Sequence, residues 1–312
     1  MRVKVKPSLK SLLTVLSFFS IAITANAGLL VTNTPDKDAF VRALAPTNNY
    51  GGGGALSVSG STSTSPLSGA TNGAFDSFIS FNTGAMVTNF NAAFGTNNWV
   101  ISSATLILTE NSSPGNAIFN SGNGAFEIRW IANDTWTEGT GTPMTPTSNG
   151  ITYNEEPSYL NANTDMNLGA FTFTGTSPLS CPLALPAAFV TNLQAGGEVG
   201  LFMTAIDPGI GFVFYSRQYG GLPSTHPALV VSAVAQPFIS AISLSGTNLV
   251  LTATNGVAGG TYYVLTSSNL ASPPDQWASI TTNVLSAGGN FVIIVTNAVN
   301  TNAQQFFIIQ TQ

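Results

Sequence analysis

Ionisable side chains are scarce in this sequence of 312 residues. It contains 8 Lys and Arg, 13 Asp and Glu, one His and one Cys, so charged residues make up only 7% of the chain. A single cysteine excludes a protein held together by internal disulfides, and a single histidine excludes a zinc site built from several histidines. Stability must come from a hydrophobic core or from bound ions, and a hydrophobic content of 44% is enough for such a core.

Half of the basic residues lie in the first ten positions. An apolar run follows over residues 12–24, and then comes Ala25-Asn26-Ala27, which fits the small-x-small pattern of a cleavage site. This order is typical of a secretory signal peptide over residues 1–27, cleaved near Ala27. The apolar run is shorter than the ~20 residues of a membrane-spanning helix. We therefore expect a secreted protein without a transmembrane anchor.

Cleavage after Ala27 would leave 285 residues with 4 basic and 13 acidic side chains, and thus a net charge of −9. The remaining cations are Lys37, Arg42, Arg129 and Arg217. Binding to nucleic acid through phosphate neutralisation needs a basic stripe, which four dispersed cations do not form. No nucleic-acid partner is expected, and anionic partners in general are disfavoured.

The remaining composition favours strands. Thr, Asn, Ser, Gly and Val are abundant, whereas Lys and Glu, the usual helix formers of a protein surface, are nearly absent. Short strand-like runs bounded by turn residues recur, as in residues 125–131, where Phe126, Ile128 and Trp130 alternate with Glu127 and Arg129. The strands expected in the first domain cover residues 39–43, 55–60, 76–82, 104–110, 125–131, 168–174, 198–205, 211–216 and 227–233. One helix is expected, over residues 186–194.

A change in composition at Gln236-Pro237 predicts a domain boundary. Residues 238–312 contain no Lys or Arg and one acid, Asp275. Five further strands are expected there, over residues 248–254, 261–267, 277–282, 290–296 and 305–310. The predicted fold is therefore all-β: a jelly-roll-like β-sandwich over residues 28–235, followed by a small immunoglobulin-like β-sandwich over residues 236–312.

The order of several short motifs in residues 31–235 resembles the DNRLRE family, or disaggregatase-related repeats, which overlaps with carbohydrate-binding modules. The motifs are Asp38-Ala39-Phe40-Val41-Arg42, Asn48-Asn49-Tyr50-Gly51, Phe78-Ile79-Ser80-Phe81, Ile101 to Leu108, Trp136-Thr137-Glu138-Gly139, Ile151-Thr152-Tyr153-Asn154, Phe214-Tyr215-Ser216-Arg217 and Pro227 to Val231. The resemblance implies an extracellular, bacterial β-sandwich of the kind appended to polysaccharide-degrading enzymes or surface proteins. Asp76 stands where family members usually carry a basic residue, and Gln218 where they carry an acidic one.

Sugar binding needs aromatic faces and planar hydrogen-bonding groups. Strict alternation over residues 212–219 would place Tyr215, Arg217 and Tyr219 on one face as a short platform, which Arg129 on another strand could extend. Trp136 and Tyr159 lie in a loop-rich region and are further candidates. The alternative is that Tyr215 and Tyr219 cover the core, that Arg217 pairs with a carboxylate, and that Trp136 belongs to the core.

Other chemistry has weaker signals. Asp36 and Asp38 could supply oxygen ligands to a structural calcium ion, although they fit no recognised calcium loop. Two pairs of carboxyls, Glu155 with Glu156 and Asp134 with Glu138, are the candidates for a glycosidase mechanism. His226, directly before a strand, and Cys181, without a basic neighbour, are expected to be structural. No nucleophile motif is present, so we do not expect an enzyme.

These observations predict a secreted, non-catalytic polysaccharide-binding protein, more suited to a neutral or weakly charged glycan than to a polyanion. The alternative is a structural or adhesive component of the cell envelope or matrix with no glycan ligand.

Overall fold

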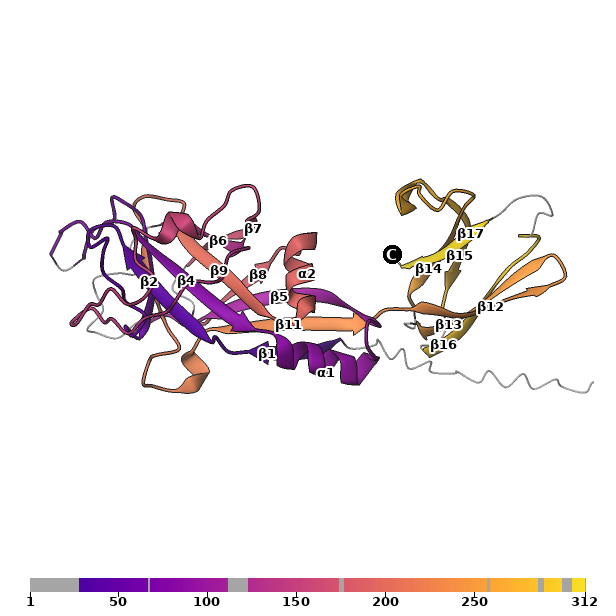
Figure 1. The fold of residues 1–312 in the computed structure, drawn as a ribbon, viewed down its shortest axis with the longest axis horizontal. Helices are drawn as coiled ribbons and strands as arrows, with labels where there is room; N and C mark the ends of the chain where they lie inside the picture. The colour runs from indigo at the N-terminus through magenta and orange to yellow at the C-terminus, as the bar shows by residue number, and fades with distance from the viewer. Residues whose placement is uncertain are drawn as a thin grey trace, which may run out of the picture.

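The computed structural model of the chain describes residues 28–66, 68–111, 123–173, 177–256, 259–285, 289–298 and 305–311. The predicted signal peptide lies outside these residues. The structure is all-β, as predicted, with antiparallel sheets and two short helices (Figure 1). No helix in the described ranges is long and apolar enough to cross a membrane.

The first domain is a sandwich of two antiparallel sheets, which confirms the predicted sandwich architecture. One sheet has the order β1-β11-β5-β8; the other has the order β10-β3-β4-β9-β6-β7, with β2 paired to β4 off this path. Its strands are β1 (Leu29–Asn33), β2 (Lys37–Arg42), β3 (Ala55–Ser59), β4 (Phe75–Asn82), β5 (Trp99–Leu108), β6 (Ala125–Ile131), β7 (Met166–Thr172), β8 (Leu179–Leu183), β9 (Glu198–Ala205), β10 (Gly211–Tyr215) and β11 (Ala228–Ala235).

The main core lies between these two sheets, where alternate residues of each strand face inward. On β6 the inward residues are Phe126, Ile128 and Trp130, the face that alternation predicts. Cys181 is fully buried in this core, and burial raises the pKa of its thiol to about 12. The structural role expected for this cysteine is confirmed.

Two helices close one end of the sandwich, where β11 finishes (Figure 1). They are α1 (Gly84–Phe94) and α2 (Ala187–Ala195). The indole N–H of Trp99 donates to Asn91 of α1 and that of Trp130 to Asn192 of α2, both at 2.8 Å. These bonds satisfy polar groups of the core that would otherwise be unpaired.

A second apolar layer covers the outer face of the seven-stranded sheet. Phe78 and Phe202 point outward from β4 and β9, and the long segment over residues 132–165 packs on them through Trp136, Ile151 and partly buried Tyr159. The ring centroids of Phe78 lie 5.7 Å from Trp136 and 4.9 Å from Phe202. We call residues 132–165 the cover segment.

The C-terminal sandwich contains two three-stranded sheets, β12-β13-β16 and β15-β14-β17. Its strands are β12 (Phe238–Ser245), β13 (Asn248–Gly256), β14 (Thr261–Ser267), β15 (Ala278–Val284), β16 (Gly289–Val295) and β17 (Phe306–Thr311). Leu251, Tyr262, Val264 and Phe291 belong to its separate core. These sheets share no strand with the first domain.

Sequence reasoning missed four elements. It placed the α2 helix within a residue of its observed bounds, but the expectation of one helix is wrong because α1 is a second one. The only start signal of helix α1 is Thr83 at its N-cap, whose side chain makes no capping hydrogen bond, and no acid lies in the first turn. It forms because Met86 and Phe90, four residues apart, bury against the core. Strands β1, β8 and β12 were also missed.

Candidate functional site

The segment expected to bind sugar begins on β10 but does not continue as a strand. Strand β10 ends at Tyr215, whose N–H donates to Thr109. The N–H of Tyr219 then returns to the carbonyl of Ser216 at 3.2 Å, which closes a turn. The predicted alternation over residues 212–219 is therefore wrong beyond Tyr215, and Arg217 and Tyr219 take their positions from the turn.

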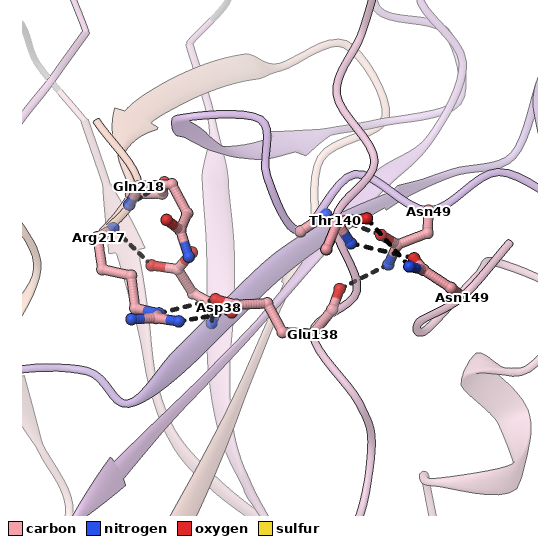
Figure 2. A network of polar contacts seen from close by, with 9 residues as sticks. Asp38, Asn49, Glu138, Thr140, Asn149, Arg217 and Gln218 are labelled. Atoms are coloured by element: carbon pink, nitrogen blue, oxygen red, sulfur yellow. Dashed lines mark hydrogen bonds and ion pairs between the residues drawn. The ribbon is translucent and has the colours of Figure 1, made fainter. Parts of the chain in front are cut away.

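Arg217 binds Glu138 of the cover segment (Figure 2). Its Nε donates to Oε1 at 2.8 Å and its Nη2 donates to Oε2 at 2.6 Å, a bidentate pair. Oε1 of Glu138 also accepts the backbone N–H of Asp38 at 2.9 Å. The guanidinium of Arg217 is thus paired with a carboxylate of the protein, which is the alternative that the sequence analysis gave for this residue.

Asp38 lies beneath this pair and is only 1% exposed. Its Oδ2 accepts the backbone N–H of Arg217 at 2.7 Å, and its Oδ1 is buried without a hydrogen-bond partner. Burial raises the pKa of Asp38 from 3.8 to about 7, the backbone bond from Arg217 opposes that rise, and the negative charge of Glu138 adds to it. The carboxyl is therefore poised to hold a proton near neutrality.

Asn49 joins the same network to the cover segment (Figure 2). Its side-chain amide donates to the carbonyls of Glu138 at 2.7 Å and Ile151 at 2.9 Å, and its oxygen accepts the N–H of Gly51 and of Gly141. The side chain is fully buried and all of its donors and acceptors have partners. Motifs that lie about 100 residues apart in the sequence thus meet in one hydrogen-bonded cluster.

The glycines of these motifs are required by close packing. A Cβ at Gly51 would lie 2.0 Å from the carbonyl oxygen of Glu138, and one at Gly139 would lie 2.2 Å from the side-chain oxygen of Asn49. Real Cβ atoms do not approach other heavy atoms so closely. The Asn-Asn-Tyr-Gly and Trp-Thr-Glu-Gly motifs therefore have a structural use that needs no ligand.

Tyr215 and Tyr219 lie together, with ring centroids 4.0 Å apart and planes 29° from parallel. Their hydrogen bond raises the pKa of the Tyr215 phenol, and nearby Glu110 adds to the rise. A Cβ at Gly221 would lie 2.1 Å from a ring carbon of Tyr219, so Gly221 packs on that ring. Tyr219 thus contacts both Tyr215 and Gly221, and both tyrosine side chains are half-buried.

The other candidates lie elsewhere. Trp136 is 2% exposed in the apolar layer, so it does not offer a ring to solvent, and Tyr159 packs beside it. Arg129 lies on β6, separated from β10 by β9, β4 and β3 in the sheet order, and its Nε is 3.7 Å from Glu127. The structure therefore brings Tyr215, Arg217 and Tyr219 together but not Arg129, Trp136 or Tyr159.

The four cationic side chains of the described residues all have partners within the protein. Arg217 binds Glu138, and Arg129 faces Glu127. Lys37 donates to the carbonyl of Asp134 at 2.6 Å and lies over the Trp136 ring, and Arg42 donates to the carbonyl of Asn72 at 3.3 Å and lies over Phe75. Arg217 and Arg129 are therefore in ion pairs, whereas no ion pair in the described residues includes Lys37 or Arg42, which contact neutral carbonyls and aromatic rings.

The expected calcium ligands do not converge. Asp36 is exposed and accepts the N–H of Asn82, whereas buried Asp38 binds the N–H of Arg217. In the described part of the chain, no group of three or more His, Cys, Asp or Glu side chains is placed to hold a metal ion. A structural calcium stays a prediction.

The expected carboxyl pairs also differ from those observed. Glu155 accepts from Thr152, Glu138 binds Arg217, and burial raises the pKa of Asp134 next to Lys37. Glu156 is instead hydrogen-bonded to Asp76 of β4. The sequence contained one indication that Asp76 has a special environment, because this acid lies within the otherwise uncharged strand Phe75–Asn82.

His226 has a structural contact. Its Nε2 lies 3.0 Å from the carbonyl oxygen of Tyr219, so it helps to hold the turn after β10. This position agrees with the role expected from the sequence.

Comparisons with known proteins give no family. The sequence matches no family model and no curated protein. Among solved structures, it is similar to a structure of the Macrobrachium rosenbergii nodavirus at 9% identity, with 100% of this chain and 97% of that chain covered and a TM-score of 0.22. That TM-score is too low to carry an argument, and the resemblance to the DNRLRE family stays a prediction without support from these comparisons.

Proposed function

We propose that the protein is a secreted, non-catalytic polysaccharide-binding protein whose first domain holds a neutral glycan. The observation that carries the proposal is that each of the four cations in the described residues has a contact within the protein, two of them as ion pairs. A polyanion would have to compete with these contacts, and it would also meet Glu110 beside Tyr215. Neutral sugar hydroxyls do not suffer this repulsion.

The glycan surface that we propose combines Tyr215 with the loop over residues 140–149. The two are joined by residues 51–54: the N–H of Gly52 donates to the carbonyl of Gly141, and Gly54 lies against Tyr219. In the loop, Asn149 donates to the hydroxyl of Thr140 at 3.0 Å and accepts from Thr147 at 2.7 Å. Hydroxyl and amide groups held in this way lose little conformational entropy when a ligand binds.

The test is affinity electrophoresis through gels that contain neutral or uronate-rich polysaccharides. We expect neutral polysaccharides to retard the protein and Tyr215→Ala to reduce the retardation by about tenfold in apparent affinity, the effect of losing about 1.4 kcal/mol. Leu30→Ala removes an exposed apolar side chain from β1, outside the proposed surface, and serves as the control. Retardation by no polysaccharide would contradict the proposal, and retardation by uronates alone would contradict its neutral class.

The second candidate is a structural or adhesive protein of the cell envelope or matrix. The C-terminal sandwich favours it, because Val292 and Ile294 on β16 are more than half exposed and Phe238 on β12 is 42% exposed. Exposed apolar side chains on one sheet are a common feature of protein interfaces. Tight association with the envelope fraction, together with no retardation by any glycan, would favour this candidate.

A further inference from the structure

Asp76 and Glu156 meet where the cover segment crosses the outer face of the seven-stranded sheet. Asp76 is 5% exposed and lies opposite Val41 of β2. Its carboxyl is hydrogen-bonded to Thr204 of β9 and to Glu156. Glu156 opens a single 3-10 turn (Glu156–Ser158) of the cover segment. The contact therefore joins the sheet directly to the segment that covers it.

A hydrogen bond between two carboxyls requires a proton on one of them, since two carboxylates have no donor. Burial and the charge of Asp76 raise the pKa of Glu156 from 4.5 to about 8. Burial raises the pKa of Asp76 to about 6, while its bonds from Thr204 and Glu156 oppose that rise. One of the two carboxyls therefore holds the shared proton, and burial favours the protonated form of each.

The surrounding groups do not neutralise a second negative charge. Tyr153 of the cover segment is a neighbouring titratable group, and the charges of Asp76 and Glu156 add to the burial that raises its pKa. On β6, Glu127 lies beside Thr204, and Arg129 faces Glu127. Arg42 at the end of β2 donates to Asn72 and lies over Phe75. In the described ranges, no ion pair includes Asp76 or Glu156.

Other bonds hold the two ends of the cover segment and do not depend on a shared proton. Asn49 binds the carbonyl of Ile151 before the 3-10 turn, and the N–H of Asn154 donates to the carbonyl of Pro46. Asp165 accepts the N–H groups of Ala132 and Asn161 beyond the turn. The stretch between these anchors, residues 155–160, is the part whose contact with the sheet includes the carboxyl pair.

We propose that the Asp76–Glu156 pair is a proton-dependent clamp that holds residues 155–160 on the sheet and releases them as the pH rises. At acidic and neutral pH, the pair keeps its shared proton and the clamp is closed. Above about pH 8 both carboxyls are ionised, repel each other in a poorly solvated position and favour the opening of the turn. Opening would uncover part of the apolar layer around Tyr159 and Phe202. This inference is independent of the glycan-binding proposal.

Hydrogen exchange of the amides in residues 155–160 tests the clamp. After correction for the intrinsic exchange rate at each pH, we expect protection in the unaltered protein to fall about tenfold between pH 8 and pH 9, because each pH unit above the pKa changes the protonated fraction about tenfold. Glu156→Gln keeps a hydrogen-bond donor for Asp76 but has no carboxyl to ionise at this position. Amide protection in residues 155–160 of this variant should therefore not change with pH. Glu155→Gln, which changes the exposed neighbour and keeps an acceptor for Thr152, should behave like the unaltered protein.

The clamp is contradicted if protection in the unaltered protein does not change between pH 6 and 9.5, or if Glu156→Gln loses protection as the unaltered protein does. Asp76→Asn is a second variant, because its amide can donate to an ionised Glu156 and should also give flat protection. If neither variant folds, carbon NMR titration of the unaltered protein decides. If Asp76 and Glu156 both titrate near their ordinary pKa values of 3.8 and 4.5, the clamp is contradicted.

Discussion

At the scale of single residues, the few charges of this protein are used to join distant segments. Asp38 comes from β2, Glu138 from the cover segment and Arg217 from the turn after β10, and each of the three contacts the other two. With so few ionisable groups, each one that is partly buried needs a specific partner. The arrangement explains why an arginine that sequence patterning placed on a binding face is instead turned toward a carboxylate.

Arg217→Ala is expected to destabilise the first domain by about 2 kcal/mol, because it leaves Glu138 and Asp38 as two carboxyls without their cation. The midpoint of urea unfolding, followed by tryptophan fluorescence, measures this loss. Arg129→Ala removes a looser pair at 3.7 Å and should change stability by less than about 1 kcal/mol. Equal losses in the two variants, or lost glycan binding without lost stability in Arg217→Ala, would show that Arg217 acts mainly as a ligand-binding residue.

At the scale of secondary-structure elements, burial decides more than local propensity. Helix α1 contains Val, Thr and three Asn or Gly residues, which disfavour a helix, beside three Ala and one Met, which favour it, and its N-cap Thr83 makes no capping hydrogen bond. It is held by Met86 and Phe90 in the core and by the bond from Trp99 to Asn91. Strand alternation was a reliable guide on β6, where one face is fully buried, and failed after Tyr215, where the chain leaves the sheet.

Phe90→Ala should therefore cost about 3 kcal/mol, since it leaves a cavity beside Trp99, whose ring centroid lies 5.0 Å from that of Phe90. Denaturant unfolding gives the free energy, and the near-ultraviolet circular dichroism of Trp99 reports the local loss of packing. Asn89→Ala, on the exposed side of the same helix, should change stability by less than about 0.5 kcal/mol. A small effect of Phe90→Ala would mean that α1 is not fixed by this contact.

At the scale of the whole molecule, three buried carboxyls give the first domain an unusual dependence on pH. The pKa of Asp38 rises to about 7, that of Asp76 to about 6 and that of Glu156 to about 8, in each case chiefly through burial. A folded state with raised acid pKa values holds protons that the unfolded chain has released. The stability from these groups is complete below about pH 4 and is lost as the pH rises toward 8.

We expect the free energy of unfolding to be lower at pH 8.5 than at pH 5 by on the order of a few kcal/mol, because one pKa unit corresponds to about 1.4 kcal/mol. Urea unfolding at a series of pH values measures this slope. Asp38→Asn should reduce the slope between about pH 4 and 7, whereas Asp275→Asn, at an exposed position of the C-terminal domain, should leave it unchanged. Stability that rises between pH 5 and 8.5 would contradict the assignment.

The amino-acid sequence by itself determined that this protein is all-β, where most of its strands run, and that only four cations lie beyond residue 27. These properties follow from local composition and a two-residue period, which need no knowledge of distant segments. Only the tertiary structure decided which side chains meet. Glu138 reaches Arg217 across 79 positions and Glu156 reaches Asp76 across 80, and burial between layers sets their pKa values, because partner choice and solvent exclusion are properties of the packed chain.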